Sequence, residues 1–283
     1  MGEFSLPSLN TFGVPFYMGW RRLSRLAGEL NRLSVMTICL QEVQQNAYIP
    51  MIQRGLSSYP YSIYERHIYA PKGGLAIFSR LPLVQHRFEV YQDMGTWYSL
   101  SFPDWATHKG ILLVNLEIEG LPVIVLNTHM NANYYGVWKR ANPLAQIEHH
   151  QVQQLHQAIH ALPNEALVIV CGDFDFPRNS FLYEELVAQN DLLDPLFDDQ
   201  RPSYRPFPLV PSKWKTSLDY ILVRQSALKN FQVQADLVEV ADAEKRHPIQ
   251  RFLTDHNART LQIKWDTVCP KSKQDTQMQD CIE

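Results

Sequence analysis

Short apolar runs alternate along this chain with a few amphipathic stretches. The first residues have the pattern of a strand, and six later runs are rich in Val, Ile and Leu. Most of these runs are bounded by Gly, Pro, Asn or Asp, as buried strands tend to be. The pattern predicts strands over residues 4–9, 35–40, 75–78, 111–116, 123–126, 167–171 and 220–223.

Three stretches carry helical spacing instead. Over residues 20–30, four apolar positions recur with a period close to 3.6, opposite a charged face. A second helix is predicted to begin after Asn142, a suitable N-cap, with Pro143 in its first turn, and to end near Leu162. A third, shorter helix is predicted over 180–189. Strands interleaved with helices indicate an α/β fold.

The predicted elements favour a single domain. Several prolines and aromatic residues interrupt any period over residues 198–215, which are predicted to be loop. We find no internal repeat, low-complexity tract or interdomain linker in the sequence. We expect one domain over residues 1–268 and a polar, disordered tail over residues 269–283.

Composition narrows the class of protein. Of the 283 residues, 45% are hydrophobic and 19% are charged, which supplies enough apolar material for a large core. The net charge of −3 lacks the basic excess of dedicated nucleic-acid binders, so nucleic acid is the less favoured partner. No run reaches the roughly 18 apolar residues that would span a bilayer, and no signal sequence is apparent.

The cysteines bear on location. Cys39 and Cys171 lie inside apolar runs and are expected to be buried thiols, whereas Cys269 and Cys281 lie in the polar tail, where a disulfide between them stays open. Two core thiols and no signal sequence favour a reducing compartment, so a cytoplasmic location is expected.

The polar residues that carry chemistry fall at the ends of the predicted strands. These residues are Glu42, His129, Asp173, Asp175, Asp219, Asp255 and His256. In α/β folds ligands bind in the crevice where strand ends meet loops, so these side chains are expected to converge. Carboxylates brought together repel one another and raise each other's pKa values, and a bound cation removes that cost.

Oxygen-rich ligand sets suit Mg²⁺, with Mn²⁺ as the alternative. Such an ion neutralises a phosphoryl oxygen, and nearby histidines supply proton transfer near neutral pH. The sequence therefore predicts a metal-dependent hydrolase of phosphate esters. Taken singly, each Asp is more often a turn former or a helix cap, so the prediction depends on their convergence.

Four further histidines crowd the second predicted helix, at positions 149, 150, 156 and 160. Only His156 and His160 have the spacing for a shared ligand. We interpret this face as solvated, and we expect Glu148 to belong to it.

The order and wording of the motifs resemble the endonuclease/exonuclease/phosphatase superfamily, the DNase I-like metal-dependent phosphoesterases. The matching pieces are Ser8-Leu9-Asn10-Thr11, Leu40-Gln41-Glu42-Val43, residues 74–80, Asn127-Thr128-His129, Gly172-Asp173-Phe174-Asp175, Leu218-Asp219-Tyr220-Ile221 and Thr254-Asp255-His256. Each motif is short, but together they cover residues 8 to 256 in the family's order. The resemblance implies a four-layer α/β sandwich, with two packed mixed sheets between outer helices.

The resemblance also implies roles for individual residues. Glu42 would be the principal Mg²⁺ ligand, with Asn10 close to the metal and phosphate and Asp255 in the metal set. Asp173 would orient or activate the attacking water. Asp219 would help position His256 or the phosphate. Asp255 would orient His256, which would act as a general base or contact the phosphate. His129 would bind the phosphate or protonate the leaving group.

Position 175 departs from the family's pattern. The family usually has Asn two residues after the Gly-Asp pair, where its amide donates to the phosphate, and this chain has Asp175. A carboxylate donates no hydrogen bond unless it is protonated, and it repels a phosphate. Two interpretations follow: Asp175 joins the metal shell, or the activity is reduced.

The local amino-acid sequence resembles the sphingomyelinase-like branch of the superfamily. Residues 127–132 and 172–177 carry this resemblance, and Lys109 is a candidate phosphate contact whose alternative is an ordinary loop lysine. Two aromatic-rich segments suit a lipid surface, although loop packing would also explain them. They hold Trp97, Tyr98, Phe102 and Trp105, and Tyr134, Tyr135 and Trp138 followed by Lys139 and Arg140.

The leading hypothesis is thus a Mg²⁺-dependent phosphodiesterase acting on a phospholipid head group, with membrane lipid as the partner. The alternatives are a nuclease or a sugar- or inositol-phosphate phosphatase on the same fold. A catalytically weakened family member that acts as a binding protein is the alternative from another class.

Overall fold

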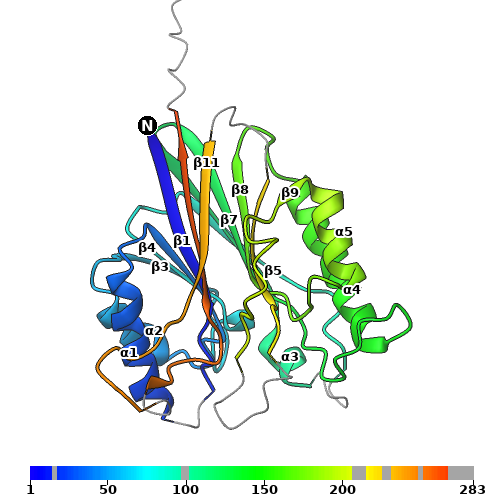
Figure 1. The fold of residues 1–283 in the computed structure, drawn as a ribbon, viewed down its shortest axis with the longest axis horizontal. Coiled ribbons are helices and arrows are strands. Elements are labelled where there is room, and N and C mark those ends of the chain that lie inside the picture. The colour runs from blue at the N-terminus through cyan, green and yellow to red at the C-terminus, as the bar shows by residue number, and fades with distance from the viewer. Residues whose placement is uncertain (15–17, 97–101, 206–214, 225–230, 248–250, 267–283) are drawn as a thin grey trace, which may run out of the picture.

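The computed structural model describes residues 1–14, 18–96, 102–205, 215–224, 231–247 and 251–266 (Figure 1). The predicted tail over 269–283 and the open disulfide between Cys269 and Cys281 lie outside these residues, as does half of the predicted loop over 198–215. Among the helices of the described part, none combines the length and the apolar character needed to cross a bilayer.

Within the described residues the strands form two six-stranded sheets. The first sheet has the order β11-β12-β1-β2-β4-β3. Its strands are β1 (Gly2–Asn10), β2 (Thr37–Gln41), β3 (Tyr61–Ile63), β4 (Ala76–Ser79), β11 (Phe231–Val238) and β12 (Ala258–Trp265). β1 runs parallel to β2 and antiparallel to β12, so the sheet is mixed.

The second sheet has the order β5-β6-β7-β8-β10-β9. Its strands are β5 (Gln85–Val90), β6 (Gly110–Ile118), β7 (Leu121–His129), β8 (Leu167–Asp173), β9 (Leu192–Leu193) and β10 (Asp219–Arg224). Only the β7–β8 pair is parallel among the pairings of this sheet in the described residues, because α4 provides the crossover that parallel neighbours require.

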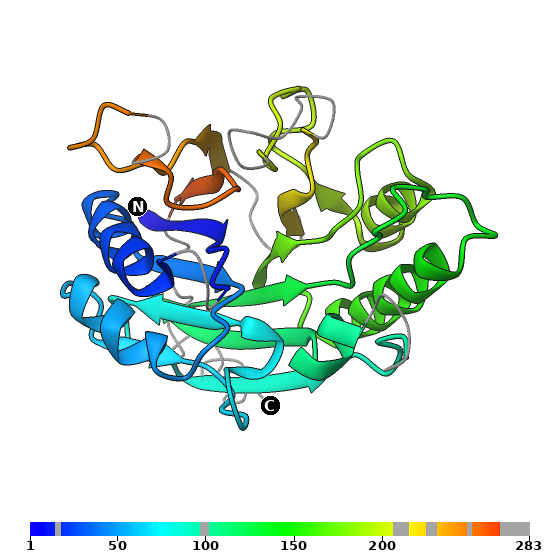
Figure 2. The same cartoon turned by 90° about the horizontal axis from the view of Figure 1, so that it is seen from below.

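Helices cover the outer faces of both sheets and give four layers. Figure 2 shows α1 (Gly19–Arg32) and α2 (Tyr48–Gly55) against the first sheet, and α4 (Pro143–His160) and α5 (Phe181–Asn190) against the second. α3 (Phe102–Thr107) lies at one end of the sandwich (Figure 1), in contact with the single turn η1 (Lys72–Gly74). The four-layer sandwich predicted from the resemblance is confirmed.

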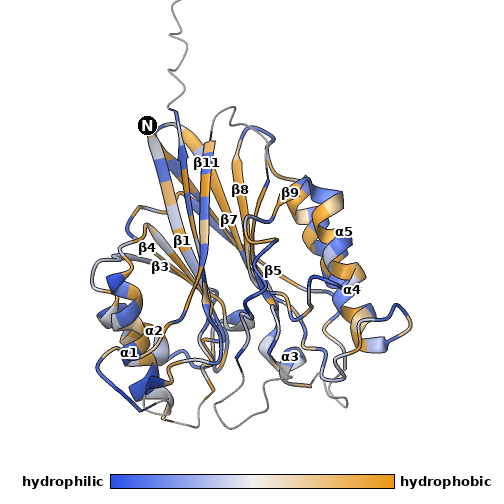
Figure 3. Ribbon diagram, in the orientation of Figure 1, coloured by the Kyte–Doolittle hydropathy of each residue, from blue (hydrophilic) through white to orange (hydrophobic). Residues whose placement is uncertain are grey.

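Strand alternation explains the layers. In β8, Ile169 and Cys171 point between the sheets, whereas Val168 and Val170 point toward α4 and α5. A strand that is apolar on both faces reads as a continuous hydrophobic run, which is why such strands were visible in the sequence. Figure 3 shows the hydrophobic colour concentrated on the central strands and on the helix faces that turn toward them.

The helices with the clearest sequence patterns were predicted close to their observed positions. The predicted first and third helices correspond to α1 and α5, and Asn142 caps α4 by accepting hydrogen bonds from the backbone N–H groups of Leu144 and Ala145. The pattern did not predict α2, which contains Pro50, or the short helix α3. It also missed β5, β11 and β12, whose outward residues are polar.

Strand direction brings the polar strand ends together. β7 and β8 are parallel and end at the paired residues His129 and Asp173. β10 runs antiparallel to β8, so it begins with Asp219 opposite Asp173. In the first sheet, β1 ends at Asn10 beside the end of β2. All of these ends lie at one edge of the sandwich.

Gly172 sits where β7 and β8 approach most closely. Its φ of 148° is a conformation that L side chains rarely adopt, and a Cβ atom here would overlap the carbonyl oxygen of Thr128. Because backbone rather than a flexible side chain is in the way, the clash would have to be relieved by moving the strand that carries Asp173.

We expect Gly172→Ala to lower the free energy of unfolding by about 3 kcal/mol, from strain and from displaced strand pairing. Gly28→Ala is the matched control, since a Cβ at Gly28 in α1 meets nothing within 4 Å. This control should gain about 0.5–1 kcal/mol from helix propensity. Urea unfolding of both variants measures the difference, and equal stabilities would contradict the assigned crowding at Gly172.

Candidate active site

Asn10 connects the two sheets at the edge where the polar strand ends meet. Its side-chain amide nitrogen donates to Asp173 Oδ2 at 2.8 Å and to Glu42 Oε1 at 3.1 Å. Its side-chain oxygen accepts from the backbone N–H of Phe12 at 2.9 Å. Asn10 therefore holds two carboxylates, one from each sheet, and the bond to Phe12 uses the oxygen that would bind a metal.

His256 also approaches the carboxylate of Asp173. Its Nδ1 is 2.8 Å from Asp219 Oδ2, and its Nε2 is 3.7 Å from Asp173 Oδ2. Asp219 is thus the residue that orients His256. Asp255, which the resemblance assigned to the same task, reaches only to 3.9 Å from Nε2. The shared role expected of Asp255 is therefore carried by Asp219.

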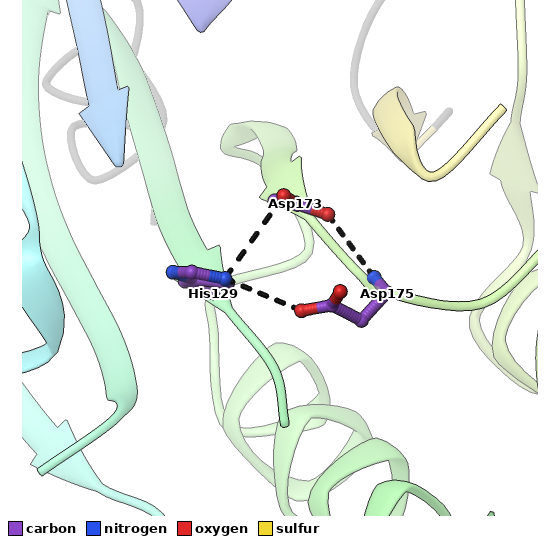
Figure 4. Close-up of side chains that lie close together, drawn as sticks. All are labelled: His129, Asp173 and Asp175. Atoms are coloured by element: carbon purple, nitrogen blue, oxygen red, sulfur yellow. Dashed lines mark hydrogen bonds and ion pairs between the residues drawn. The ribbon is translucent and has the colours of Figure 1, made fainter. Parts of the chain in front are cut away.

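His129 completes the group around Asp173 (Figure 4). Its Nε2 is 3.9 Å from Asp173 Oδ2, 3.2 Å from Asp175 Oδ2 and 2.9 Å from Lys109 Nζ. When neutral at this atom, the imidazole accepts from Lys109, and when protonated it donates to Asp175. Each protonation state of His129 therefore has a partner, which suits a group that gives up and regains a proton.

Lys109 is buried in the site. Its ammonium is 2.7 Å from Asp104 Oδ1 and 3.6 Å from Asp175 Oδ2, and it also donates to the carbonyl of Met130. Burial lowers the pKa of Lys109, but the two carboxylates outweigh burial and raise it above the usual value. Lys109 is therefore a buried, fixed positive charge in the loop position directly before β6.

Asp175 faces these cations. Burial acts to raise its pKa, but Lys109 and His129 outweigh burial, and the pKa of Asp175 lies below its usual value. Its backbone adopts a left-handed conformation, with φ of 58°, which Asn and Asp tolerate better than most residues. An exchange of Asn for Asp at this position therefore changes the charge of the site and leaves the backbone requirement satisfied.

The carboxyl groups of Asp173 and Asp255 are poised near neutral pH. Burial, with the charges of Asp175 and Asp219, raises the pKa of Asp173 to about 7. Burial and the charge of Glu42 raise the pKa of Asp255 to about 6, although His256 lowers it. Burial lowers the pKa of His256, but Asp219 and Asp173 outweigh burial and raise it well above the usual value. Such perturbed groups gathered in one place are typical of active sites.

The donor set fits a hard divalent cation. Oδ1 of Asp255 is buried, and within the described part of the chain no hydrogen-bond donor reaches it. The neighbouring Glu42 contributes a second carboxylate, and its charge disfavours ionisation of Asp255. A bound cation would supply the missing partner of that oxygen.

Two other groups bring ligand atoms within 4.8 Å of one another, His129 with Asp173 and Asp175, and Asp173 with Asp219 and His256. In both groups a histidine is already paired with a carboxylate. The Glu42–Asp255 side of the site offers two carboxylates, and oxygen ligands of this kind are the ones that Mg²⁺ prefers.

A cavity of about 370 Å³ opens beside these residues. Glu42, Lys109, His129 and Asp175 line it, together with Tyr134 from the loop that follows β7. A wider groove of about 810 Å³ crosses the outer face of β1, β11 and β12, and its lining includes none of the residues described above. We assign the chemistry to the smaller cavity, because His129 and Asp175 line it and the pKa values of both are shifted by their neighbours.

Glu148 does not belong to a solvated helix face, as the sequence pattern suggested. It is fully buried on the inner side of α4, where it accepts hydrogen bonds from Asn133 Nδ2 at 3.2 Å and Trp138 Nε1 at 3.3 Å. Burial raises the pKa of Glu148 to about 9, so its side chain is protonated at neutral pH. The expectation failed because the loop after β7 folds back over this part of the helix.

Sequence reasoning also missed Asp104. This residue is buried in α3, binds Lys109, and accepts a hydrogen bond at 3.3 Å from the backbone N–H of Ala132. Asp104 lies five residues before Lys109 in the sequence, but this spacing did not indicate that both side chains are buried and paired.

Residues 21–256 match the model of the Endonuclease/Exonuclease/phosphatase family. Sphingomyelin phosphodiesterase 2 from Mus musculus is 28% identical over 278 residues, which are 91% of this chain and 64% of that protein. The chain thus spans somewhat less than two thirds of the length of this relative.

Solved structures share the fold. A beta toxin mutant from Staphylococcus aureus with bound magnesium ions superimposes with a TM-score of 0.70 at 16% identity, covering 92% of this chain and 99% of that chain. D. rerio TDP2 complexed with a single-strand DNA product also has a TM-score of 0.70, at 15% identity, covering 93% of this chain and 99% of that chain.

The buried Glu148 makes a prediction about stability and pH. In the folded state it keeps its proton up to pH of about 9, whereas in the unfolded chain it loses the proton near its ordinary value of 4.5. Between these values the unfolded state binds fewer protons, so stability falls as pH rises. Glu148→Gln removes this contribution.

We therefore expect the stability of Glu148→Gln relative to the parent to improve by on the order of 2 kcal/mol between pH 6 and pH 8. Urea unfolding of both proteins at the two pH values measures this difference of differences. A constant offset between the proteins, independent of pH, would show that Glu148 is ionised throughout.

Proposed function

The chain belongs to the Endonuclease/Exonuclease/phosphatase family, and we propose that it is a Mg²⁺-dependent phosphodiesterase acting on the head group of a sphingomyelin-type phospholipid. The observation that carries the proposal is the arrangement around Asp173, which lies between two imidazoles and is tied by Asn10 to Glu42. The Nε2 atoms of His129 and His256 approach the same oxygen, Oδ2, at 3.9 and 3.7 Å, so proton donors and acceptors converge on one carboxylate next to oxygen ligands for a cation.

Glu42 and Asp255 would hold the cation, at the side of the site where a buried carboxylate oxygen has no donor among the described residues. A bound Mg²⁺ supplies positive charge to a phosphoryl oxygen and to the leaving oxygen. Asn10 positions Glu42 for this task through its amide nitrogen. Its own ligand role, expected from the resemblance, would use the second lone pair of the side-chain oxygen, because Phe12 donates to the first.

The protein's own groups account for the proton movements. Asp173, whose pKa of about 7 suits a base near neutral pH, takes a proton from the attacking water. The water oxygen bonds to phosphorus, and the bond from phosphorus to the leaving oxygen breaks. His129 gives its proton to that oxygen and then accepts a hydrogen bond from Lys109. His256, held by Asp219, contacts a phosphoryl oxygen as a cation.

The lipid substrate is supported by the relative and by the surface. Sphingomyelin phosphodiesterase 2 from Mus musculus is similar over nearly the whole of this chain. The cavity that holds the reactive groups is also flanked by exposed aromatic residues, among them Trp105 and Tyr135. A nuclease is the alternative, since D. rerio TDP2 has the same fold and was crystallised with a DNA product.

A panel of three substrates tests the proposal: sphingomyelin in detergent micelles, supercoiled plasmid DNA and an inositol phosphate, each with Mg²⁺ and with EDTA. We expect phosphocholine release from sphingomyelin only with Mg²⁺. Glu42→Ala should abolish this release with an unchanged circular dichroism spectrum, and Glu185→Ala, a carboxylate on α5, is the matched control. Plasmid cleavage without lipid hydrolysis would refute the lipid substrate and favour the nuclease.

Asp175 allows a second test, because it places a negative charge beside the phosphate-binding cations. We expect Asp175→Asn to lower the KM for the phosphodiester several-fold, because Asp175 would no longer partly neutralise the positive charge of Lys109. Asp191→Asn is the control, at another left-handed position, φ 50°, at the end of α5. A raised KM or lost turnover in Asp175→Asn, with the fold intact, would mean that the carboxylate itself is needed.

A further inference from the structure

Large apolar side chains are exposed around the mouth of the catalytic cavity. Three segments contribute to this surface, which we call the apolar rim: the hairpin before η1, the helix α3 and the loop after β7. Its members are Ile68, Tyr69, Phe102, Trp105, Tyr134, Tyr135 and Val137, each between 39% and 82% exposed. Trp97 and Tyr98, which the sequence grouped with two of these residues, lie outside the described residues.

The three segments meet at the cavity. Gly73 and Gly74 of η1, Ala106 and Thr107 near the end of α3, and Tyr134 of the loop all line it. The rings of His67 and His108 lie 4.5 Å apart and join the hairpin to α3. A substrate entering the cavity must therefore pass between exposed apolar side chains.

The hairpin holds its apolar tip in place. Ile68 and Tyr69 form the turn between the bridged residues Arg66 and Pro71, and they are 73% and 82% exposed. The side chain of Asn46 donates to the carbonyl of His67 at 2.7 Å, and its backbone N–H donates to the carbonyl of Tyr69 at 2.9 Å. The backbone of the turn is thus fixed, while its two side chains project into solvent.

Buried polar groups fix the loop after β7 in the same way. Gln151 of α4 bonds to both the backbone and the side chain of Asn131, at 2.9 and 2.6 Å. Glu148 holds Asn133 and Trp138 on either side of Tyr134, Tyr135 and Val137. Buried hydrogen bonds of this kind order a loop before it meets its partner, and such pre-organisation lowers the entropy lost on binding.

The charges in these segments match a phospholipid surface. Arg66 and Lys139 are exposed among the rim residues, whereas the exposed Arg140 is paired with Glu185 at 2.5 Å. The acid of the hairpin, Glu65, is paired with Lys72 at 3.5 Å. Aromatic side chains with basic neighbours favour the interface of a bilayer, where rings lie at the head-group level and cations attract anionic lipids.

We propose that the apolar rim docks on a phospholipid bilayer and places the cavity mouth directly on the lipid head groups. The inference rests on the proposed function, because the reacting phosphate of a membrane lipid lies at the depth that the rim would occupy. The rim then favours substrates that lie in a bilayer, because docking brings their head groups to the cavity. It does not affect the hydrolysis of phosphodiesters in solution.

Vesicle binding tests the rim apart from catalysis. Vesicles of phosphatidylcholine, with and without phosphatidylserine, contain no sphingomyelin, so their binding is independent of turnover. We expect the parent protein to sediment with vesicles, more strongly with phosphatidylserine. The double variant Ile68→Ser/Tyr69→Ser and, separately, Tyr135→Ser should lose about tenfold or more in binding, because each removes a large inserted side chain.

Val84→Ser and Phe197→Ser are matched controls, since both residues are exposed, at 69% and 59%, and lie outside the rim. They should bind vesicles as the parent does. Rim variants should also hydrolyse a water-soluble phosphodiester, bis(p-nitrophenyl) phosphate, at the parent's rate, because none of the substituted residues lines the cavity. Hydrolysis of sphingomyelin in vesicles should fall with binding.

The outcomes separate this inference from the proposed function. A parent that does not bind vesicles, or rim variants that bind as the parent does, overturn the docking surface, even where sphingomyelin in detergent is hydrolysed. Rim-dependent binding by a protein that hydrolyses no phospholipid supports the surface and refutes the substrate. Self-association of the parent that the rim variants abolish, without vesicle binding, would assign the rim to a second copy of the chain.

Discussion

The site depends on one buried side chain that joins the two sheets. Asn10, at the end of β1, donates 2.8 Å to Asp173 at the end of β8, and the same amide holds Glu42. A second buried link lies just behind it, where Gln41 donates to Asn127 at 2.6 Å. Asn127 also donates to the carbonyl of Leu40 at 3.0 Å. Because the apolar contacts between the sheets are non-directional, these polar bonds fix the lateral alignment of the strand ends.

Charge balance is the second constraint on the site. Within the described residues the carboxylates of Asp104, Asp173, Asp175 and Asp219 are each close to Lys109, His129 or His256. Asp255 is also within 3.9 Å of His256, but its buried Oδ1 has no hydrogen-bond donor among those residues, and Glu42 lies near it. The site thus has one group of carboxylates held by Lys109 and the two imidazoles, and one pair of carboxylates that suits a cation.

The sequence was informative where one strand or one helix decided the outcome. β7 and β8 are apolar on both faces and end in His129 and Asp173, so their position and their chemistry were visible together. The cap of α4 at Asn142 was equally local. Edge strands such as β5 were missed because their side chains are exposed and carry no apolar period.

Contacts between segments far apart in the chain could not be predicted from the sequence. Glu148 looked like part of a charged helix face, and only the return of the loop that carries Asn133 and Trp138 buries it. The choice between Asp219 and Asp255 as the partner of His256 likewise depended on the antiparallel start of β10. Spacing along the chain does not contain this information, because it arises from how separate strands are aligned.

The pairing of β1 with β12 has a consequence for the growing polypeptide. β12, at Ala258–Trp265, is the last described strand, and it pairs with β1 from Gly2 to Ser8. Just before β12, the hydroxyl of Thr254 donates to the carbonyl of Asn10 at 2.7 Å. During synthesis β1 therefore lacks its partner on this edge until the chain has been made as far as residue 265. A shortened chain that ends at His256 would still contain Asn10, Asp173 and His256, but it would leave this edge of β1 unpaired.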